Sequence, residues 1–439
     1  MFCLSLLLPA AAAQKPAASG KVSSVPAAKL VALKATGTAR YTDKEILASS
    51  GLQIGQTAAD GDFKEAVRRL GNSGLFSDVA YSYTSSGATV KLELQLTDTD
   101  KSKLVPARFE NFVWFTDDEL RAALQRRVPL FKQLLPLSGN LADEVSEALQ
   151  AMLTEKQFPG RVNYMREGDQ SGGPVSAMVY RAEEVSIRIS SFEFPGATPE
   201  QAALLTTAAR NATGAEYGRS SLVAVAKVDL MPVFLQRGYL KAAFGPSEAR
   251  VVPNPPPAED AQVAVGDVQV IAIVPVMPGK VYSTSVVEWK GNSAIATSEV
   301  APLVHLPPGE PVDAVRLLRD VENVGKLYRS RGYMTVQVRP EAQFDDEHSA
   351  VRYDLNVVEG DLYKMGELEI AGLDTQSTIR MRDAWTLRQE QPYNADYPKK
   401  FLDDTRQLVP RGVPWAVSVH ESLDAKDKTV DVEIRFKQQ

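Results

Sequence analysis

The element order of this chain is decided by residues 281–359, whose sequence is VYSTSVVEWKGNSAIATSEVAPLVHLPPGEPVDAVRLLRDVENVGKLYRSRGYMTVQVRPEAQFDDEHSAVRYDLNVVE. The run Val281–Val287 predicts a strand, because β-branched residues are enriched in it, and the turn Lys290-Gly291-Asn292 closes it. A helical segment follows and is stopped by Pro307-Pro308-Gly309-Glu310-Pro311. The first half of the stretch therefore predicts a strand and a helix.

The second half of the stretch predicts another helix and a pair of strands. The apolar residues of the helix are Val315, Leu318, Val321 and Leu327, and the helix ends at Arg331-Gly332-Tyr333. The strands follow as two alternating segments, one with Met334, Val336 and Val338 on a face and one with Val351, Tyr353, Leu355 and Val357. The predicted order of the whole stretch is β-α-α-β-β.

This order recurs along the chain. A glycine closes each predicted second helix, at positions about 80 to 90 residues apart: Gly74, Gly160, Gly238, Gly332 and Gly412. Each unit is long enough for a small core of its own, unlike the shorter repeats of solenoids. The pattern predicts five α+β repeats, at 29–99, 100–183, 184–277, 278–360 and 361–439.

The first and last repeats carry clear alternating hairpins. In the first, Val79, Tyr81 and Tyr83 alternate with polar residues before a turn and a second alternating segment. In the last repeat, Trp415, Val417 and Val419 do the same. Both patterns predict sheets with one buried face.

The second and third repeats are more divergent. In the second, residues 109–115 are expected to supply the first strand, followed by a helix that starts with a capping box at Thr116 and Glu119. In the third, a Pro-rich loop is expected over residues 246–262, which is long for a hairpin. This loop is either a functional excursion or a tolerated insertion.

Composition and the N-terminal residues narrow the class of protein. Hydrophobic residues make up 44% of the chain and charged residues 24%, as in a folded globular protein. The net charge of -6 and the absence of a dense Lys/Arg run give no support to nucleic-acid binding. Residues 1–13, MFCLSLLLPAAAA, predict a secretory signal peptide, with a flexible leader over 14–28; the alternative, a membrane anchor, is too short to span a bilayer. No later segment predicts a transmembrane helix.

Catalytic and cofactor motifs are not found in the sequence. The only cysteine, Cys3, lies in the predicted signal peptide, so the mature chain would have no thiol for disulfides, metal ligation or nucleophilic catalysis. The three histidines, His305, His348 and His420, lie far apart and show no metal-binding spacing. We expect a protein that is not an enzyme and that binds no cofactor or metal.

The repeat resembles the POTRA domain. The resemblance lies in the β-α-α-β-β order, in Gly-Leu-Phe, Gly-Tyr-Leu and Gly-Tyr-Met after the second helix, and in the junction at 358–372. It implies a small mixed three-stranded sheet covered by two helices, in a periplasmic arm of the kind found in BamA- and TamA-type outer-membrane assembly proteins. Those proteins carry a barrel after the arm; no series of lipid-facing strands follows the last repeat, so a soluble POTRA array or a barrel encoded separately is expected.

The resemblance also suggests where partners would bind. In POTRA domains the second strand lies at a sheet edge, whose unpaired N–H and C=O groups accept an extended peptide by β-augmentation. The corresponding residues here are Val79, Tyr81, Tyr83, Met334, Val336, Val338, Trp415, Val417 and Val419. Their side chains are expected to pack the core, and the backbone edge is the proposed binding element. The partners implied are unfolded outer-membrane proteins or a separate barrel or assembly protein, with peripheral outer-membrane association left open; the alternative is a structural spacer that binds no client.

Overall fold

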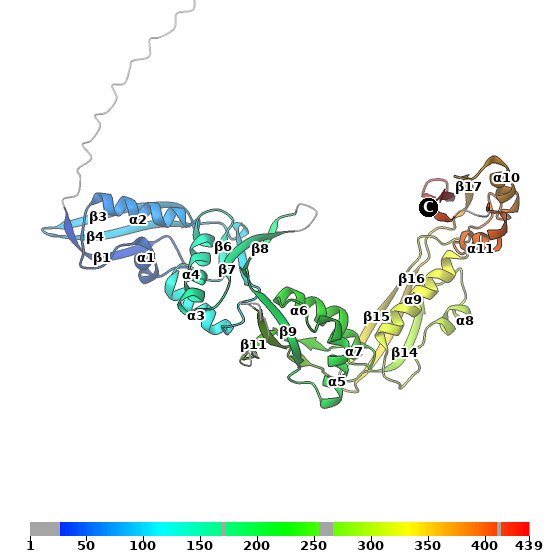
Figure 1. Cartoon of the computed structure of the whole chain (residues 1–439), viewed down its shortest axis with the longest axis horizontal. Coiled ribbons are helices and arrows are strands. Elements are labelled where there is room, and N and C mark those ends of the chain that lie inside the picture. The colour runs from blue at the N-terminus through cyan, green and yellow to red at the C-terminus, as the bar shows by residue number, and fades with distance from the viewer. Residues whose placement is uncertain (1–26, 169–172, 254–266, 411–413, 439) are drawn as a thin grey trace, which may run out of the picture. The chain divides into compact units, whose positions relative to one another are not determined.

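The computed structural model describes residues 27–168, 173–253, 267–410 and 414–438 (Figure 1). The described residues form two compact units, one reaching to residue 187 together with 267 and 268, the other formed by 188–253 and 269–438. The predicted signal peptide, Gly412 and residues 254–262 of the predicted loop lie outside the described residues. The α+β class and the repeated β-α-α-β-β order are confirmed, while the five domain boundaries stay a prediction.

The first repeat is a four-stranded sheet with two helices. Its elements are β1 (Ala28–Thr36), α1 (Asp43–Ser50), β2 (Thr57–Ala58), α2 (Asp60–Asn72), β3 (Phe76–Ser86) and β4 (Thr89–Asp98). The strand order is β2-β1-β4-β3, with β4 parallel to β1 and antiparallel to β3. Helix α2 packs along β3 (Figure 1). The expected three-stranded sheet therefore gains a fourth, two-residue strand, because the chain after α1 returns beside the start of β1.

The second repeat keeps this topology with a displaced first strand. Its elements are β5 (Leu104–Phe109), α3 (Asp117–Arg127), β6 (Leu134–Pro136), α4 (Leu141–Glu155), β7 (Arg161–Gly168) and β8 (Val175–Glu183), in the order β6-β5-β8-β7. The prediction of a strand over 109–115 is wrong, because β5 ends where that segment begins. Beyond it the amide side chain of Asn111, 1% exposed, replaces the ladder: it donates to the Ala182 carbonyl at 2.9 Å and accepts from the Ala182 N–H at 2.8 Å.

The third repeat departs furthest from the common order. It contains β9 (Ser186–Glu193), α5 (Pro199–Ala208), a helix of α6 (Arg219–Val225) and α7 (Met231–Leu235) joined by a π-helical turn at Ala226–Leu230, and β10 (Ala243–Phe244), β11 (Glu248–Val251), β12 (Asp267–Ile273) and β13 (Val276–Met277). The strands form a sheet β11-β12-β9 and a small pair β10-β13. The prediction of a loop from residue 246 is wrong for 248–251, which pair with β12.

The fourth and fifth repeats are three-stranded, as expected. The fourth contains β14 (Ser283–Lys290), α8 (Thr297–Val300), α9 (Ala314–Arg329), β15 (Gln337–Asp345) and β16 (Ala350–Val358), in the order β14-β16-β15. The fifth contains β17 (Lys364–Ala371), α10 (Thr375–Ala384), α11 (Tyr397–Asp404), β18 (Trp415–Asp424) and β19 (Thr429–Gln438), in the order β17-β19-β18. In both, the first strand is parallel to the central strand and the second strand antiparallel to it.

Apolar residues of the central strands form the cores. Repeats 1 and 2 share one continuous buried cluster, whereas the C-terminal repeat has a cluster of its own around Ile370, Met381 and Phe401. A glycine after the first strand allows the chain to turn tightly over the central strand. At Gly291, with φ of +80°, an added Cβ would lie 2.2 Å from the Val357 carbonyl oxygen. Only glycine fits this conformation and this distance without displacing the backbone.

Candidate functional site: the free sheet edges

Three hairpin strands end their sheets on one side. Strands β3, β15 and β18 each pair with one central strand, β4, β16 and β19 respectively. Every second N–H and C=O of such a strand points away from its partner. These groups are the ones that an added strand would pair with. The candidate site is therefore a set of backbone edges, and the side chains beside each edge decide how accessible it is.

The β3 edge has a filled helix-side face. Val79, Tyr81 and Tyr83 lie opposite Leu96, Leu94 and Leu92 of β4 and face α2. The rings of Tyr81 and Tyr83 both pack near Phe63 of α2, and the Tyr81 hydroxyl donates to the Asp60 carboxylate at 2.6 Å. That hydrogen bond and desolvation raise the pKa of Tyr81 to about 12. No other described strand pairs with the outer edge of β3, and its helix-facing side chains contact α2, although Tyr83 stays 36% exposed.

The β15 edge differs from the expectation at its start. The strand begins at Gln337, so Val338 lies in it while Met334 and Val336 precede it; the predicted start at Met334 is wrong. The physical reason is packing: Met334 contacts the core of the fifth repeat, and the chain at Met334-Thr335 turns instead of extending.

Two further features restrict the β15 edge. Pro340 stands in the middle of the strand and has no N–H, as is typical of strands at a sheet edge. At the far end, Phe344 packs edge-on against Tyr282, with ring centroids 5.0 Å apart. Of the nine residues of β15, Arg339, Glu341 and Asp345 are charged. Proline and charge are two devices by which proteins protect edge strands from pairing.

The β18 edge is the most open of the three. Trp415 anchors its start, with the indole N–H donating to the Pro410 carbonyl at 3.1 Å and the ring packed edge-on against Phe436. Farther along, Val417 and Val419 are 42% and 38% exposed. Leu423, on the same face, is 46% exposed and was not singled out from the sequence, although it continues the alternation.

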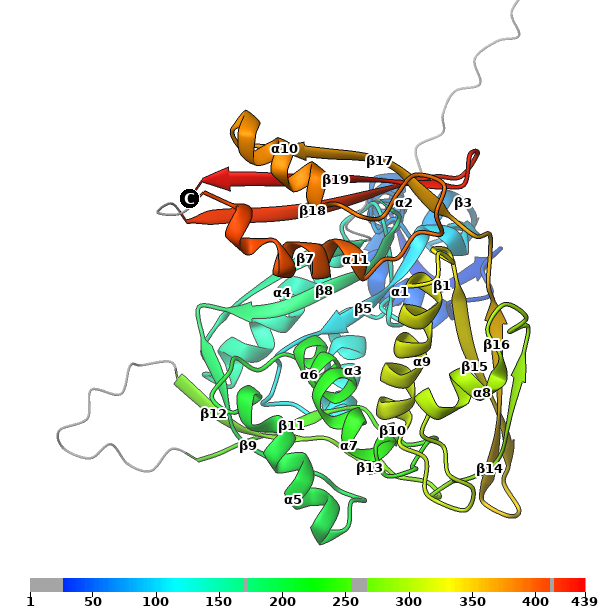
Figure 2. The same cartoon turned by 90° about the vertical axis from the view of Figure 1, so that its right-hand side faces the viewer.

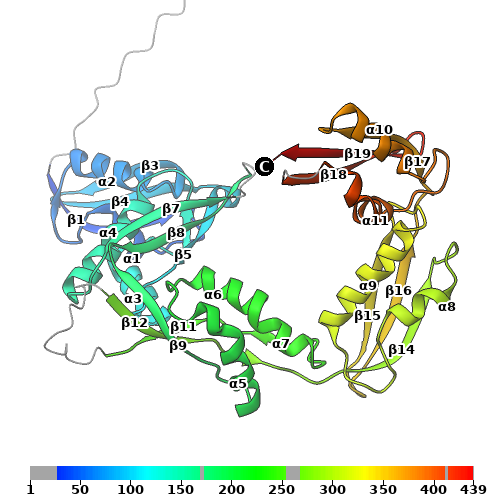
Figure 3. The same cartoon turned by 45° about the vertical axis from the view of Figure 1, so that its right-hand side comes forward.

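Helix length explains this exposure. Helix α11 has eight residues, whereas α2 has thirteen and α9 has sixteen. At 1.5 Å per residue, α11 is about 12 Å long, against about 24 Å for α9. The ten residues of β18 extend about 33 Å, so α11 is too short to cover the strand. Figures 2 and 3 both show α11 beside β18.

A groove lies along the helix side of β18. It has a volume of about 330 Å³ and is lined by Leu402, Asp403, Arg406, Val409, Val417 and Phe436. Four of these six residues are apolar, and Asp403 and Arg406 pair with each other at 2.8 Å at the rim. We call the free edge of β18 together with this groove the C-terminal edge site. An extended segment beside β18 would place alternate side chains over the groove.

Sequence reasoning missed two edges in the divergent repeats. Among the described strands, β7 pairs with β8 alone and carries Met165, which is 63% exposed. In the same part of the chain, β11 pairs with β12 alone. The alternation of Val162 and Tyr164 was a signal for β7, whereas β11 falls in a segment whose prolines favour a loop.

The described residues show little that would serve chemistry. Among them, no group of three or more His, Cys, Asp or Glu side chains is arranged to hold a metal ion. His348 bonds to the neighbouring Asp345 at 2.8 Å in the hairpin turn of the fourth repeat. Within the same described ranges, no helix has the length and hydropathy needed to cross a membrane.

Comparison with known proteins matches one segment of the chain to a family model. Residues 282–360 match the model of the POTRA family, described as a surface antigen variable number repeat. Among solved structures, the chain is similar to POTRA3–5 of Haemophilus influenzae BamA, at 16% identity over 57% of this chain and 96% of that chain, with a TM-score of 0.41. It is also similar to the N-terminal domain of Omp85 from Thermosynechococcus elongatus (18% identity, 58% and 99% coverage, TM-score 0.24) and to CdiB from Escherichia coli (15%, 46% and 31%, 0.22).

Proposed function

We propose, from the POTRA domain at 282–360 and the repeats that share its element order, that this chain is a periplasmic scaffold in outer-membrane protein assembly or secretion. It would bind an extended segment of a client or partner protein by β-augmentation. The proposed partners are unfolded outer-membrane proteins, or a separate barrel or assembly protein. No catalytic step is part of this proposal.

The observation that carries the proposal is the C-terminal edge site. A free ten-residue strand edge lies beside a groove that already contains half-exposed Val417. Backbone pairing tolerates many partner sequences, while the groove favours bound segments in which every second residue is apolar. Unfolded barrel proteins supply such segments, since their strands alternate apolar and polar residues.

A second candidate function is a spacer between other envelope components. The β15 edge favours it for the fourth repeat, because Pro340 and the charged residues of that strand oppose pairing. The two functions differ in one measurable property. A client-binding arm keeps an unfolded barrel protein soluble, and a spacer does not.

Two adjacent proline substitutions test the proposal. Ser418 and Val419 are consecutive residues of β18, which pairs antiparallel with β19. The N–H group of one of them therefore points to β19, and the N–H group of the other points to the free edge. We therefore expect one of the variants Ser418→Pro and Val419→Pro to lower the melting temperature, and the other to fold normally and lose binding. The probe is a urea-unfolded barrel protein diluted into the full chain, followed by light scattering and by fluorescence anisotropy. If the normally folded variant suppresses aggregation as well as the wild type does, edge pairing at β18 is refuted.

A further inference from the structure

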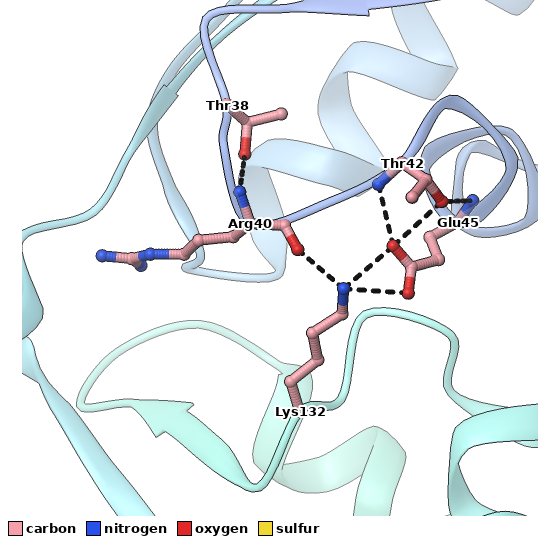
Figure 4. Close-up of polar contacts among 5 residues, drawn as sticks. All are labelled: Thr38, Arg40, Thr42, Glu45 and Lys132. Carbon is pink, nitrogen blue, oxygen red and sulfur yellow. Dashed lines mark hydrogen bonds and ion pairs between the residues drawn. The ribbon is translucent and has the colours of Figure 1, made fainter.

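At two junctions a lysine from one repeat contacts residues of the neighbouring repeat. In the first unit, Lys132 of the second repeat donates to the Arg40 carbonyl at 2.6 Å and pairs with the Glu45 carboxylate at 2.9 Å (Figure 4). Its ammonium nitrogen also lies 5.0 Å from the ring centroid of Tyr41. Arg40, Tyr41 and Glu45 all belong to the first repeat.

The second unit repeats this chemistry with different residues. Lys241, just after the second helix of the third repeat, pairs with the Asp346 carboxylate at 2.5 Å. Its nitrogen lies 4.5 Å from the ring centroid of Phe344 and 5.3 Å from that of Tyr282. All three partners belong to the fourth repeat. We call each arrangement of lysine, carboxylate and aromatic ring a lysine clasp, and each combines an ion pair with a cation–π contact.

Each clasp adds a polar contact to the other contacts at its junction. At the 3–4 junction these are a backbone hydrogen bond from the Tyr282 N–H to the Gly238 carbonyl at 2.8 Å and the packing of Leu240 against the core of the fourth repeat. At the 1–2 junction they are the bond from the Asn140 N–H to the Asn72 carbonyl at 2.9 Å and the buried cluster that the two repeats share. A clasp that lies away from these contacts further restricts rotation about them.

The 4–5 junction has a related but weaker arrangement. The Tyr363 N–H donates to the Gly332 carbonyl at 2.8 Å, in the same way as Tyr282 and Gly238. Here Lys428 pairs with Asp361 of the connecting segment at 2.7 Å and lies 5.9 Å from the Tyr363 ring. This lysine and this ring belong to the same repeat. The contact therefore fixes the connecting segment rather than the preceding repeat.

We infer that the lysine clasps restrict rotation between consecutive repeats and are weakened by salt. The direction in which each free sheet edge faces depends on the orientation of the repeats. The clasp side chains are partly exposed, at 37% for Lys132, 41% for Lys241 and 63% for Asp346. Ion pairs with this exposure are screened when the Debye length falls from about 8 Å at physiological salt to about 3 Å at 1 M. The stiffness of each clasped pair of repeats thus depends on ionic strength.

The 3–4 clasp gives the sharper test. Spin labels are attached to the full chain at Glu200→Cys in α5 and Asn323→Cys in α9, both exposed positions, with Cys3→Ser as background. Pulsed electron resonance then measures the distribution of distances between the labels. We expect a narrow distribution for the wild type at low salt. It should become about twofold wider at 1 M NaCl and, at low salt, in Lys241→Met, while Lys241→Arg stays narrow because it keeps the charge and the aromatic contact.

Hydrogen exchange at the Tyr282 amide is an independent readout. Loss of the clasp should speed this exchange about fivefold, a small change because the ion pair is exposed. The matched control is Lys64→Met, which removes an ion pair of 2.8 Å inside helix α2 and should change neither readout. Asp346→Asn should reproduce Lys241→Met. If Lys241→Met folds and keeps the wild-type distance width and exchange rate at both salt concentrations, the inference is overturned.

Discussion

Removing the apolar side chains of the C-terminal edge site should weaken client binding far more than folding. The perturbation is the triple variant Val417→Ser, Val419→Ser and Leu423→Ser. These residues are 42%, 38% and 46% exposed in the free chain, so a bound segment would cover the remaining surface. Fully burying one such side chain contributes about 1.5–3 kcal/mol, so covering two-fifths of each of three contributes about 2–4 kcal/mol.

The expected loss of affinity follows from this sum. Only part of the free energy of burying apolar surface appears as binding affinity, so we use the lower value, about 2 kcal/mol. This corresponds to about a 30-fold increase in Kd. Isothermal titration of the full chain with a synthetic nine-residue strand of alternating apolar and polar residues measures it. The melting temperature of the triple variant reports any loss of folding separately.

A matched variant on the other face of the same strand is the control. Ser418→Ala, His420→Ala and Ser422→Ala change three residues of β18 that point away from the groove. This control should keep Kd within about twofold, because no groove contact is lost. Equal binding by the two triple variants would refute a role for these apolar side chains, of which Val417 lines the groove, and leave only the backbone edge.

Three further predictions concern single residues. Gly291→Ala should lower the stability of the fourth repeat by about 2–4 kcal/mol, because it combines the left-handed conformation with a Cβ 2.2 Å from the Val357 oxygen. The control Gly309→Ala has a similar φ but open space around the added Cβ, so it should lower stability by about 1 kcal/mol. Equal shifts in melting temperature would contradict the steric argument. Asn111→Ala should cost about 2–4 kcal/mol, because it leaves both backbone groups of Ala182 unpaired in a buried site, whereas the exposed Asn163→Ala should change the free energy of unfolding by less than about 0.5 kcal/mol. The Lys241 ammonium, and to a smaller extent the Tyr282 hydroxyl, hold the pKa of the Asp346 carboxyl below its ordinary 3.8. The clasp is therefore complete above that pH and is lost as the pH falls through the folded-state pKa. Lys241→Met should raise the pKa of Asp346 in an NMR titration, and an unchanged pKa would argue against the contact.

The repeat itself could be predicted from the sequence because its signals are local. Alternation within Val79–Tyr83 and Trp415–Val419, helix spacing within 315–327 and a glycine after each second helix all act over a few residues. The resemblance to POTRA domains then implied that β3, β15 and β18 lie at sheet edges. The prediction failed where a local pattern was overridden by packing. Met334 alternates with Val336 but is held in a turn by the core of the next repeat.

Only the tertiary structure shows which sheet edge is the most open and which contacts join consecutive repeats. All three edges look alike as alternating segments. They differ in how far the second helix covers the strand and in whether a neighbouring repeat contacts its end, as Lys241 contacts Phe344. The clasps join groups 87 residues apart at Lys132 and Glu45, and 105 apart at Lys241 and Asp346. No periodicity links such positions, since an ion pair or a cation–π contact depends on distance in space. Local pattern therefore determined the elements of this protein, and packing determined which of their edges stayed open.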